Sequence, residues 1–385
     1  MIRDNVRIAG VLLVIAAAIG IAACGGNGNP ITVCPLASSS SCGCAPGSLA
    51  CLAPAYLYAA GIDGKISVFP VNASSGVLSA AASTTTAVAT LGMSAINNQF
   101  LYISNSPSNV ASQATIDAWS VNLSDGALTT VSGSPFSLGL LSVGQGVAAN
   151  STAQVLYIAD AGRIDAMKAD SSGALTPLSG SPYLTGGNLY LTLDPQNRFL
   201  FASNDDPPGS VFAFTVDATS GALTPVAGSP FAISSSSGNR QPAAIAVDLT
   251  GQYVYTVLPA TNQVAAFSIA SASGALSPVA GSPFATGNSP VALAAVNGFL
   301  YVSNAKDGTT SGYSIDLATG VLTPLSGSPF VIPAGPLVTD PAGRFLFAST
   351  AAGMMAFTID SSSGALTPTG LPVPYSGAGV LTYVQ

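Results

Sequence analysis

The sequence predicts an all-β fold, a seven-bladed β-propeller with four antiparallel strands per blade, from three observations. A Gly-(Ala/Val)-Leu-(Thr/Ser) turn occurs seven times between Gly76 and Gly364, at a mean spacing of 48 residues. An aromatic-rich strand pattern recurs with it, and each repeat has room for four short strands. Repeats of this length and content are typical of sheets that stack radially around one axis.

The first and second strands of each repeat differ in bulk. Segments such as AIAVD from Ala244 and ALAAV from Ala292 carry small side chains, which suit a strand crowded near the axis. The second strand is apolar almost throughout, which predicts burial on both faces. It is rich in β-branched and aromatic residues, as strands are. It starts at Tyr56, Phe100, Val155, Phe199, Tyr253, Phe299 and Phe345.

The third and fourth strands form a hairpin, as in VFAFTVD from Val211 followed by the turn that ends at Gly221. Proline lacks an amide hydrogen and is tolerated in a sheet only at its edge, so the fourth strand is expected to be outermost. Prolines stand in it at Pro177, Pro225, Pro278, Pro324 and Pro368.

The ring is expected to close through the two ends of the chain. The first repeat lacks an inner strand, whereas the sequence ends in GVLTYVQ from Gly379. We therefore predict that the C-terminal strand completes blade one, and that residues 55–385 form the propeller.

The composition excludes much chemistry. All 16 acidic residues are Asp, and the sequence has no Glu and no His. A Ser-His-Asp triad, a Cys-His site and an imidazole metal ligand are therefore impossible. The net charge of -7 leaves no basic surface for phosphates, so no nucleic-acid partner is expected. The sequence suggests no metal or cofactor, and we expect a monomer.

The N-terminus has the layout of a secretory signal. Arg3 and Arg7 precede the apolar run 8–23, and Ile21-Ala22-Ala23-Cys24 resembles the bacterial lipobox. The resemblance implies a signal peptide over residues 1–23, acylation of Cys24 and a membrane-lipid partner. Gly25 favours export to the outer membrane or cell surface. An ordinary signal or anchor helix is the alternative.

Four further cysteines lie within residues 24–54, which we interpret as a tether. Disulfides are the simplest interpretation in an exported chain, because an oxidising compartment favours them. Two pairings remain open: 34 with 42 plus 44 with 51, or 34 with 44 plus 42 with 51. A four-thiolate metal site is the alternative. The residues are Cys34, Cys42, Cys44 and Cys51.

Several motifs resemble those of the seven-bladed lactonase-type propellers, which include 6-phosphogluconolactonase. GSPF or GSPY links follow five repeats, FLYVSN-like strands and SGALTP hairpins recur, and Asp-Pro-x-x-Arg turns begin at Asp194 and Asp340. Members with a catalytic site resemble one another in a Pro-Arg-His step and an Asn-Glu step. Here the first reads Pro242-Ala243-Ala244, and the second reads Asn304-Ala305 or Asn204-Asp205.

Strand parity gathers polar residues at one face, formed by the loops after the second strands and before the inner strands, which we call the channel-mouth face. If a lactone is hydrolysed there, Arg240 could stabilise the oxyanion while Asp205 or Asp160 guides water. Equally, Arg240 could pair with Asp205 or Asp206 on a wet rim. The remaining candidate binding residues are Asn105, Asn204, Gln241, Asn304, Lys306 and Asp307.

Other polar and aromatic residues are interpreted structurally. Arg198 and Arg344 each follow an Asp by four residues on the opposite face, where they would brace a turn. Trp119 is expected to be core, with a stacking platform for sugar as the alternative. Asp205-Asp206 could hold calcium, but two adjacent carboxylates are a weak signal.

Three functions fit these features. The leading hypothesis is an exported, lipid-anchored propeller that binds a carbohydrate, peptide or protein through the channel-mouth face. The second is a lactone hydrolase that uses Arg240 with Asp205 or Asp160. The third, a spacer without a ligand, predicts a polar rim with no concave pocket.

Overall fold

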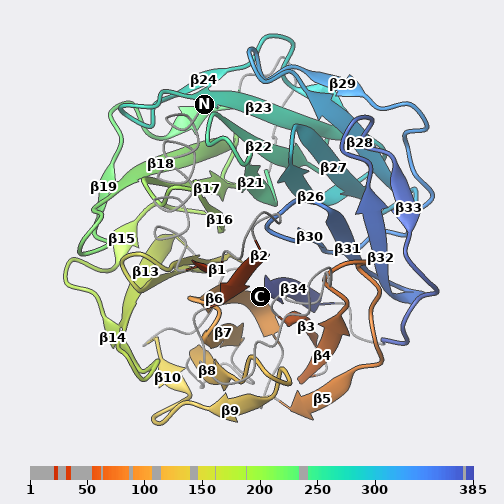
Figure 1. Cartoon of the computed structure of the whole chain (residues 1–385). Coiled ribbons are helices and arrows are strands. Elements are labelled where there is room, and N and C mark those ends of the chain that lie inside the picture. Colours follow the sequence, from red (N-terminus) through yellow and green to blue (C-terminus); the bar gives the residue numbers. More distant parts are fainter. Residues whose placement is uncertain are drawn as a thin grey trace, which may run out of the picture.

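Seven antiparallel sheets form a ring around one axis in the computed structural model (Figure 1). Within the part of the chain that the structure describes there is no helix. The seven-bladed all-β prediction is therefore confirmed. The described residues are 21–24, 32–35, 54–61, 64–85, 90–105, 114–138, 146–160, 162–187, 189–233, 242–375 and 379–385.

Inner strands surround the axis, and each lies beside the inner strand of the next blade, so the ring closes. The small residues of AIAVD and ALAAV fall in two of them, as expected. From blade one to blade seven they are β34 (Gly379–Val384), β6 (Thr90–Ile96), β11 (Val147–Asn150), β16 (Leu189–Leu193), β21 (Ile245–Val247), β26 (Pro290–Val296) and β30 (Leu337–Thr339).

The second strands are the most deeply buried elements, and several are buried at every position. Their apolar faces form seven core layers, one between each pair of neighbouring blades. The strands are β3 (Ala55–Gly61), β7 (Phe100–Asn105), β12 (Val155–Asp160), β17 (Phe199–Asn204), β22 (Tyr253–Leu258), β27 (Phe299–Asn304) and β31 (Phe345–Thr350).

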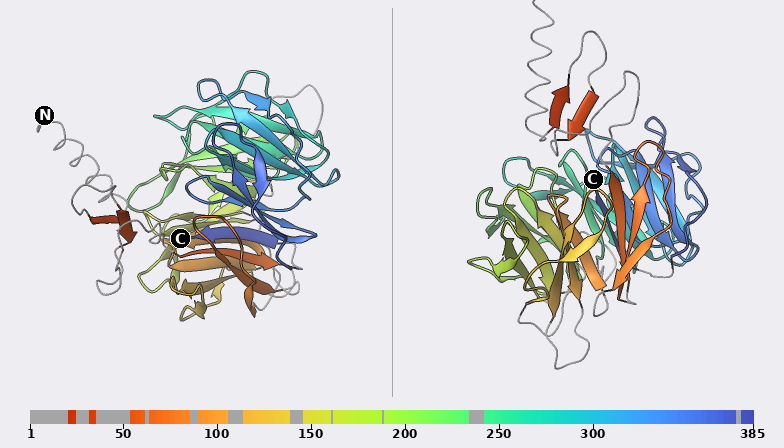
Figure 2. Two further views of the ribbon diagram at one scale, coloured as in Figure 1. Left: turned by 45° about the vertical axis from the view of Figure 1, so that its right-hand side comes forward. Right: turned by 60° about the horizontal axis from the view of Figure 1, so that its bottom comes forward.

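The third strands pair with the second strands along their whole length and carry the outer edge of each blade. Seen edge-on, the blades form a thick disc (Figure 2). The strands are β4 (Lys65–Val71), β8 (Thr115–Val121), β13 (Arg163–Ala169), β18 (Ser210–Val216), β23 (Gln263–Ile269), β28 (Thr309–Ile315) and β32 (Gly353–Ile359).

The predicted fourth strand is outermost, as expected, but it is only three residues long. Its edge position is confirmed by the exposed proline that ends it in five blades. The outer strands are β9 (Leu128–Thr130), β14 (Leu175–Pro177), β19 (Leu223–Pro225), β24 (Leu276–Pro278), β29 (Leu322–Pro324) and β33 (Leu366–Pro368).

The GSPF links return the chain to the same edge, a feature that the strand patterns did not predict. In four blades a two-residue strand after the link pairs with the other end of the third strand. Between the two short strands, the serine of the link accepts a hydrogen bond from a backbone N–H of the third strand. In blade four, Ala213 N–H donates to Ser229 Oγ at 3.0 Å. The short strands are β10 (Phe136–Ser137), β15 (Tyr183–Leu184), β20 (Phe231–Ala232) and β25 (Phe284–Ala285).

Blade one is completed by both ends of the propeller, as predicted. The C-terminal β34 pairs antiparallel with β3, with Tyr56 opposite Val384 and Gly61 opposite Gly379. The blade's outer edge is formed by β5 (Ala82–Thr85) and an isolated bridge between Val71 and Leu78.

Neighbouring blades are joined by glycine and tyrosine contacts. A Cβ on Gly274 would lie 2.5 Å from Cδ1 of Phe199 in the preceding blade, and Gly274 has a φ of +75°. Glycine is thus required both by backbone conformation and by close packing. At five interfaces a buried tyrosine hydroxyl donates to the carbonyl of this turn glycine, the pairs being Tyr58–Gly126, Tyr102–Gly173, Tyr157–Gly221, Tyr255–Gly320 and Tyr301–Gly364.

N-terminal to the propeller, β1 (Ile21–Cys24) and β2 (Thr32–Pro35) pair antiparallel. The predicted apolar signal segment falls almost wholly outside the described residues, as do Cys42, Cys44 and Cys51. The side chains of Cys24 and Cys34 also lie outside them. No helix among the described residues is long and apolar enough to cross a membrane.

Candidate functional site

The channel-mouth face is formed where the second strands end, and three asparagines stand at those ends. Asn105, Asn204 and Asn304 are the last residues of β7, β17 and β27, and all three are buried. The structure therefore brings these three predicted asparagines to one face, but distributes them over separate blades.

In blade four, the predicted cluster is a self-supporting loop. Asn204 Oδ1 accepts the backbone N–H of Asp206 at 3.0 Å, and Asp206 accepts Gly209 N–H through its carbonyl at 2.7 Å. A Cβ on Gly187 would lie 1.8 Å from Asn204 Oδ1, so the amide is pressed against the loop before β16. Asp206 is exposed, whereas Asp205 is half-buried.

Asp205 lies close enough to Tyr190 on the inner strand β16 to act on its titration. Burial raises the pKa of the Tyr190 phenol, and the Asp205 carboxylate raises it further.

In blade six, the polar side chains are also engaged with their own loops. Asn304 Nδ2 donates to Ser311 Oγ at 2.9 Å and to Thr309 Oγ1 at 3.2 Å. Asp307 accepts the backbone N–H and the side-chain amide of Asn288, and these bonds lower its pKa. Lys306 is exposed.

Among the described residues, blade two has two buried side-chain oxygens without a hydrogen-bond partner, whereas blade six has one, Asn304 Oδ1. Asn105 is 1% exposed, and its Oδ1 has no hydrogen bond. Thr90, its cross-strand neighbour on β6, is 3% exposed, and its Oγ1 is likewise without a partner. Asp117 on β8 lies beside them. Burial raises the pKa of Asp117, and the Asn105 amide acts against that rise.

In blade three, Asp165 occupies the position that Asp117 has in blade two. Its carboxylate pairs with Arg163 two residues earlier, with Nε and Oδ2 3.1 Å apart. Asp160 ends β12 opposite Arg163, but its side chain lies outside the described residues.

Two of the predicted residues, Arg240 and Gln241, lie outside the described part of the chain. The alanine positions beside them are described. Ala243 is half-buried, and its carbonyl accepts the hydroxyl of Ser203 at 2.6 Å. Ala305, after Asn304, donates its N–H to the Ser289 carbonyl at 2.8 Å.

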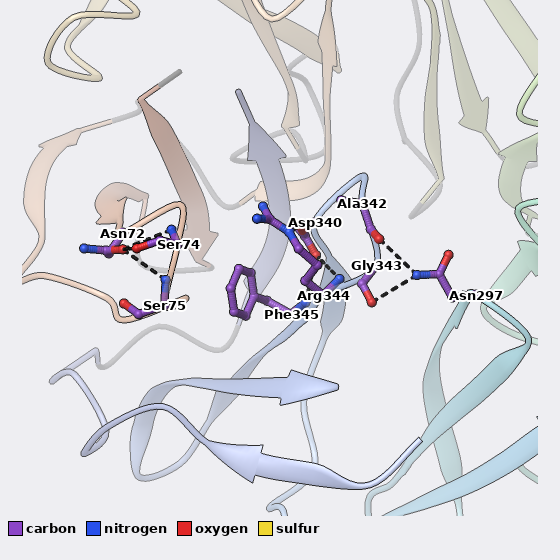
Figure 3. A network of polar contacts seen from close by, with 9 residues as sticks. All are labelled: Asn72, Ser74, Ser75, Asn297, Asp340, Ala342, Gly343, Arg344 and Phe345. Carbon is purple, nitrogen blue, oxygen red and sulfur yellow. Dashed lines mark hydrogen bonds and ion pairs between the residues drawn. The ribbon is translucent and has the colours of Figure 1, made fainter. Parts of the chain in front are cut away.

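On the opposite face, the Asp-Pro-x-x-Arg turns are braced as predicted. Arg344 Nε lies 3.0 Å from Asp340 Oδ2, and Asp340 Oδ1 accepts the backbone N–H groups of Arg344 and Phe345 (Figure 3). Arg198 and Asp194 repeat the pair at 2.8 Å. Each guanidinium also stacks over the following phenylalanine, at 5.2 Å for Arg198 and 5.0 Å for Arg344.

A pocket of about 460 Å³ lies on this opposite face, between blades four and five, where strand patterns gave no signal for it. One wall is Arg198, whose Nη1 donates to the Ser271 carbonyl at 3.4 Å. The lining is mostly polar and open to solvent. It consists of Arg198, Thr250, Gly251, Gln252, Tyr253, Ser268, Ile269 and Ser271.

Trp119 packs against the core layer between blades one and two, which supports its interpretation as a core residue. Its indole Nε1 is buried without a hydrogen-bond partner.

No group of three or more Cys and Asp side chains that could hold a metal is found among the described residues. The chain is a seven-bladed β-propeller whose channel-mouth face carries asparagines and scattered carboxylates.

Part of the chain is similar to the lactonase-type propellers. Residues 208–338 match the family model described as "Lactonase, 7-bladed beta-propeller". This match confirms the resemblance of the repeat motifs. No curated protein matches the chain.

Solved structures of similar fold cover the whole propeller. Two are proteins provisionally assigned as 6-phosphogluconolactonases. That from Bacteroides fragilis has 17% identity and a TM-score of 0.69, and covers 86% of this chain and 98% of its own. That from Bacteroides uniformis has 14% identity, a TM-score of 0.70, and coverages of 86% and 99%. The periplasmic gluconolactonase of Pseudomonas aeruginosa has 16% identity, a TM-score of 0.66, and coverages of 86% and 99%. At these identities the likeness concerns the fold.

Proposed function

We propose that this protein is an exported, lipid-anchored propeller that binds a carbohydrate, a peptide or a partner protein through its channel-mouth face. One observation carries the proposal: the positions at which catalytic members resemble one another in Arg and His are Ala243 and Ala244. The neighbouring polar groups Asn204, Asn304 and Asp307 are engaged in supporting their own loops. A face built this way offers fixed polar edges and backbone groups, which suit recognition better than proton transfer.

The ligand is expected to be weakly charged. Few charged groups occur anywhere in the chain, and charged residues make up 6% of it. A strongly charged partner would need complementary charge that the chain does not provide.

A glycan array probed with the purified full chain tests this proposal. Binding should weaken when Asp205→Ala and Asn304→Ala are combined at the channel-mouth face. The matched control is Asp217→Ala, because Asp217 caps an exposed turn after the third strand of blade four, on the opposite face. The proposed face would be contradicted if both variants lost glycan binding equally. It would also be contradicted if binding were lost on substitution of Gln252, which lines the pocket on the opposite face.

Lactone hydrolysis is the second candidate, favoured by the family match over residues 208–338, which spans Arg240. Arg240 would stabilise the developing oxyanion while Asp205 or Asp160 orients water. The assay is hydrolysis of sugar, phosphorylated-sugar and acyl lactones, with spontaneous hydrolysis subtracted. Turnover that is lost in Arg240→Ala would establish this function and displace the binding proposal; background rates on every substrate would remove it.

Membrane attachment would follow from acylation of Cys24. The test is metabolic labelling with an alkyne fatty acid, in which the wild-type chain should become labelled and Cys24→Ala should not. Equal labelling of the two chains would contradict attachment at this residue.

A further inference from the structure

Blades two, three and six provide an internal comparison of one position. Asp117, Asp165 and Ser311 are each the third residue of the third strand of their blade. The first residue of that strand pairs with the last residue of the second strand. Because side chains alternate along a strand, residues two apart lie on the same side of the blade. The three blades thus carry different side chains, two carboxylates and a hydroxyl, at one structurally equivalent position.

Blade six is the neutral version. Ser311 accepts a hydrogen bond from Asn304 Nδ2 at 2.9 Å, and Thr309 accepts another at 3.2 Å. These contacts also show that the asparagine at the end of the second strand reaches the third-strand position.

Blade three is the charge-paired version. Asp165 is buried, and Arg163 supplies the positive charge at 3.1 Å. A buried carboxylate ordinarily requires such a partner, since taking a charge out of water is costly.

Blade two has the carboxylate without the arginine. Asp117 is buried, but the residue two positions before it is Thr115, and none of the ion pairs between described residues involves Asp117. Lys65 of blade one lies at the same end of the disc. It alternates with Ile66, which packs toward blade two, so the Lys65 side chain is directed to the other side of its sheet.

The same corner holds two buried oxygens without hydrogen bonds, Asn105 Oδ1 and Thr90 Oγ1. Buried polar atoms in native proteins nearly always have a partner, so atoms of this kind call for one. The blade-six geometry shows how Nδ2 can turn to the third strand, which here carries Asp117. Thr90 is paired with Asn105 across β6 and β7, and Asp117 follows Thr115, the β8 partner of Asn105, by two residues. The register thus places the amide oxygen, the threonine hydroxyl and a carboxylate oxygen at one corner of the blade.

We propose that these three oxygens of blade two bind a hard, oxygen-preferring divalent cation, calcium, at the junction with blade one near the channel mouth. Carboxylate, amide carbonyl and hydroxyl oxygens are ligands that calcium accepts, with water completing its coordination. The cation occupies the role that Arg163 has in blade three. With a single carboxylate the affinity is modest, in the range of about 10⁻⁴–10⁻³ M that extracellular modules use.

The test is heat unfolding of the full chain in detergent, with calcium from zero to 10 mM at constant ionic strength. For a dissociation constant of about 1 mM, mass action and the size of the propeller give a rise in Tm of about 2 °C at 10 mM. The rise should be absent in Asp117→Asn. The matched control Asp165→Asn loses an ion pair, so its Tm falls, but its calcium-dependent rise should stay.

A variant that adds a positive charge beside Asp117 tests the calcium proposal without removing any side chain of the site. Thr115→Arg copies the blade-three pair into blade two, and should raise Tm without calcium while abolishing the calcium-dependent rise. The proposal is overturned if the wild-type Tm does not respond to calcium, if Asp117→Asn responds like the wild type, or if magnesium or sodium produces the same rise.

Discussion

The tyrosine contacts between blades allow a quantitative prediction. Tyr→Phe at position 255 removes one hydroxyl that donates to the Gly320 carbonyl at 3.2 Å, in a fully buried site. The ring itself fits without the hydroxyl, because blades four and seven carry Phe201 and Phe347 at the equivalent position. The loss is therefore one net hydrogen bond plus an unpaired carbonyl, about 1–2 kcal/mol of unfolding free energy.

The assay is urea unfolding followed by the fluorescence of Trp119, the single tryptophan. The five tyrosines serve different interfaces, so their effects should add, and the fivefold Phe variant should lose about 5 kcal/mol or more. The control is Tyr383→Phe, whose hydroxyl is buried without a hydrogen-bond partner and whose removal should cost nothing. Conversely, Phe201→Tyr should gain about 1 kcal/mol by reaching the Gly274 carbonyl. If the five single variants lose no more than Tyr383→Phe, the tyrosine contacts do not stabilise the ring.

Three further predictions concern single positions. Ser229→Ala orphans the N–H of Ala213 and should cost about 1–3 kcal/mol in urea unfolding, whereas exposed Ser220→Ala should cost less; equal costs would contradict the role of the link serine. Gly274→Ala should lower Tm more than Gly308→Ala, since both have positive φ but only the first meets an aromatic ring; equal losses would mean that the ring simply moves aside. In chelator, Asp117→Asn should be more stable than the wild type at pH 7. Burial raises the pKa of Asp117 above 3.8, so the wild type loses stability as pH rises through that pKa and the carboxylate becomes charged. The difference in stability between the variant and the wild type should therefore vanish in more acidic solution. A stability difference that persists there would show that charge is not its cause.

Much of the fold follows from local patterns. The second strands, the edge prolines and the closing strand from Gly379 could be predicted because apolar runs, missing amides and repeat phase are visible residue by residue. The split outer edge was not predictable in the same way. The role of Ser229 depends on which third-strand N–H faces the gap between β19 and β20, and that is set by pairing register.

The candidate site was only partly predictable. Strand parity placed Asn105, Asn204 and Asn304 on one face, but not their burial or bonding. Asp117 within TIDAWSV was a signal that could have been used, because a carboxylate interrupts an otherwise apolar strand position. The pocket beside Arg198 arises where two turns from neighbouring blades meet, which no single repeat encodes.

Closure of the ring depends on the pairing of β34 with β3. Without residues 379–384, β3 has an open edge and the ring has a gap between β6 and β30. A chain truncated before Gly379 would expose that edge as a template for pairing with other chains. Only a chain that contains β34 can close the ring, so chains that lack it should be cleaved faster by proteases.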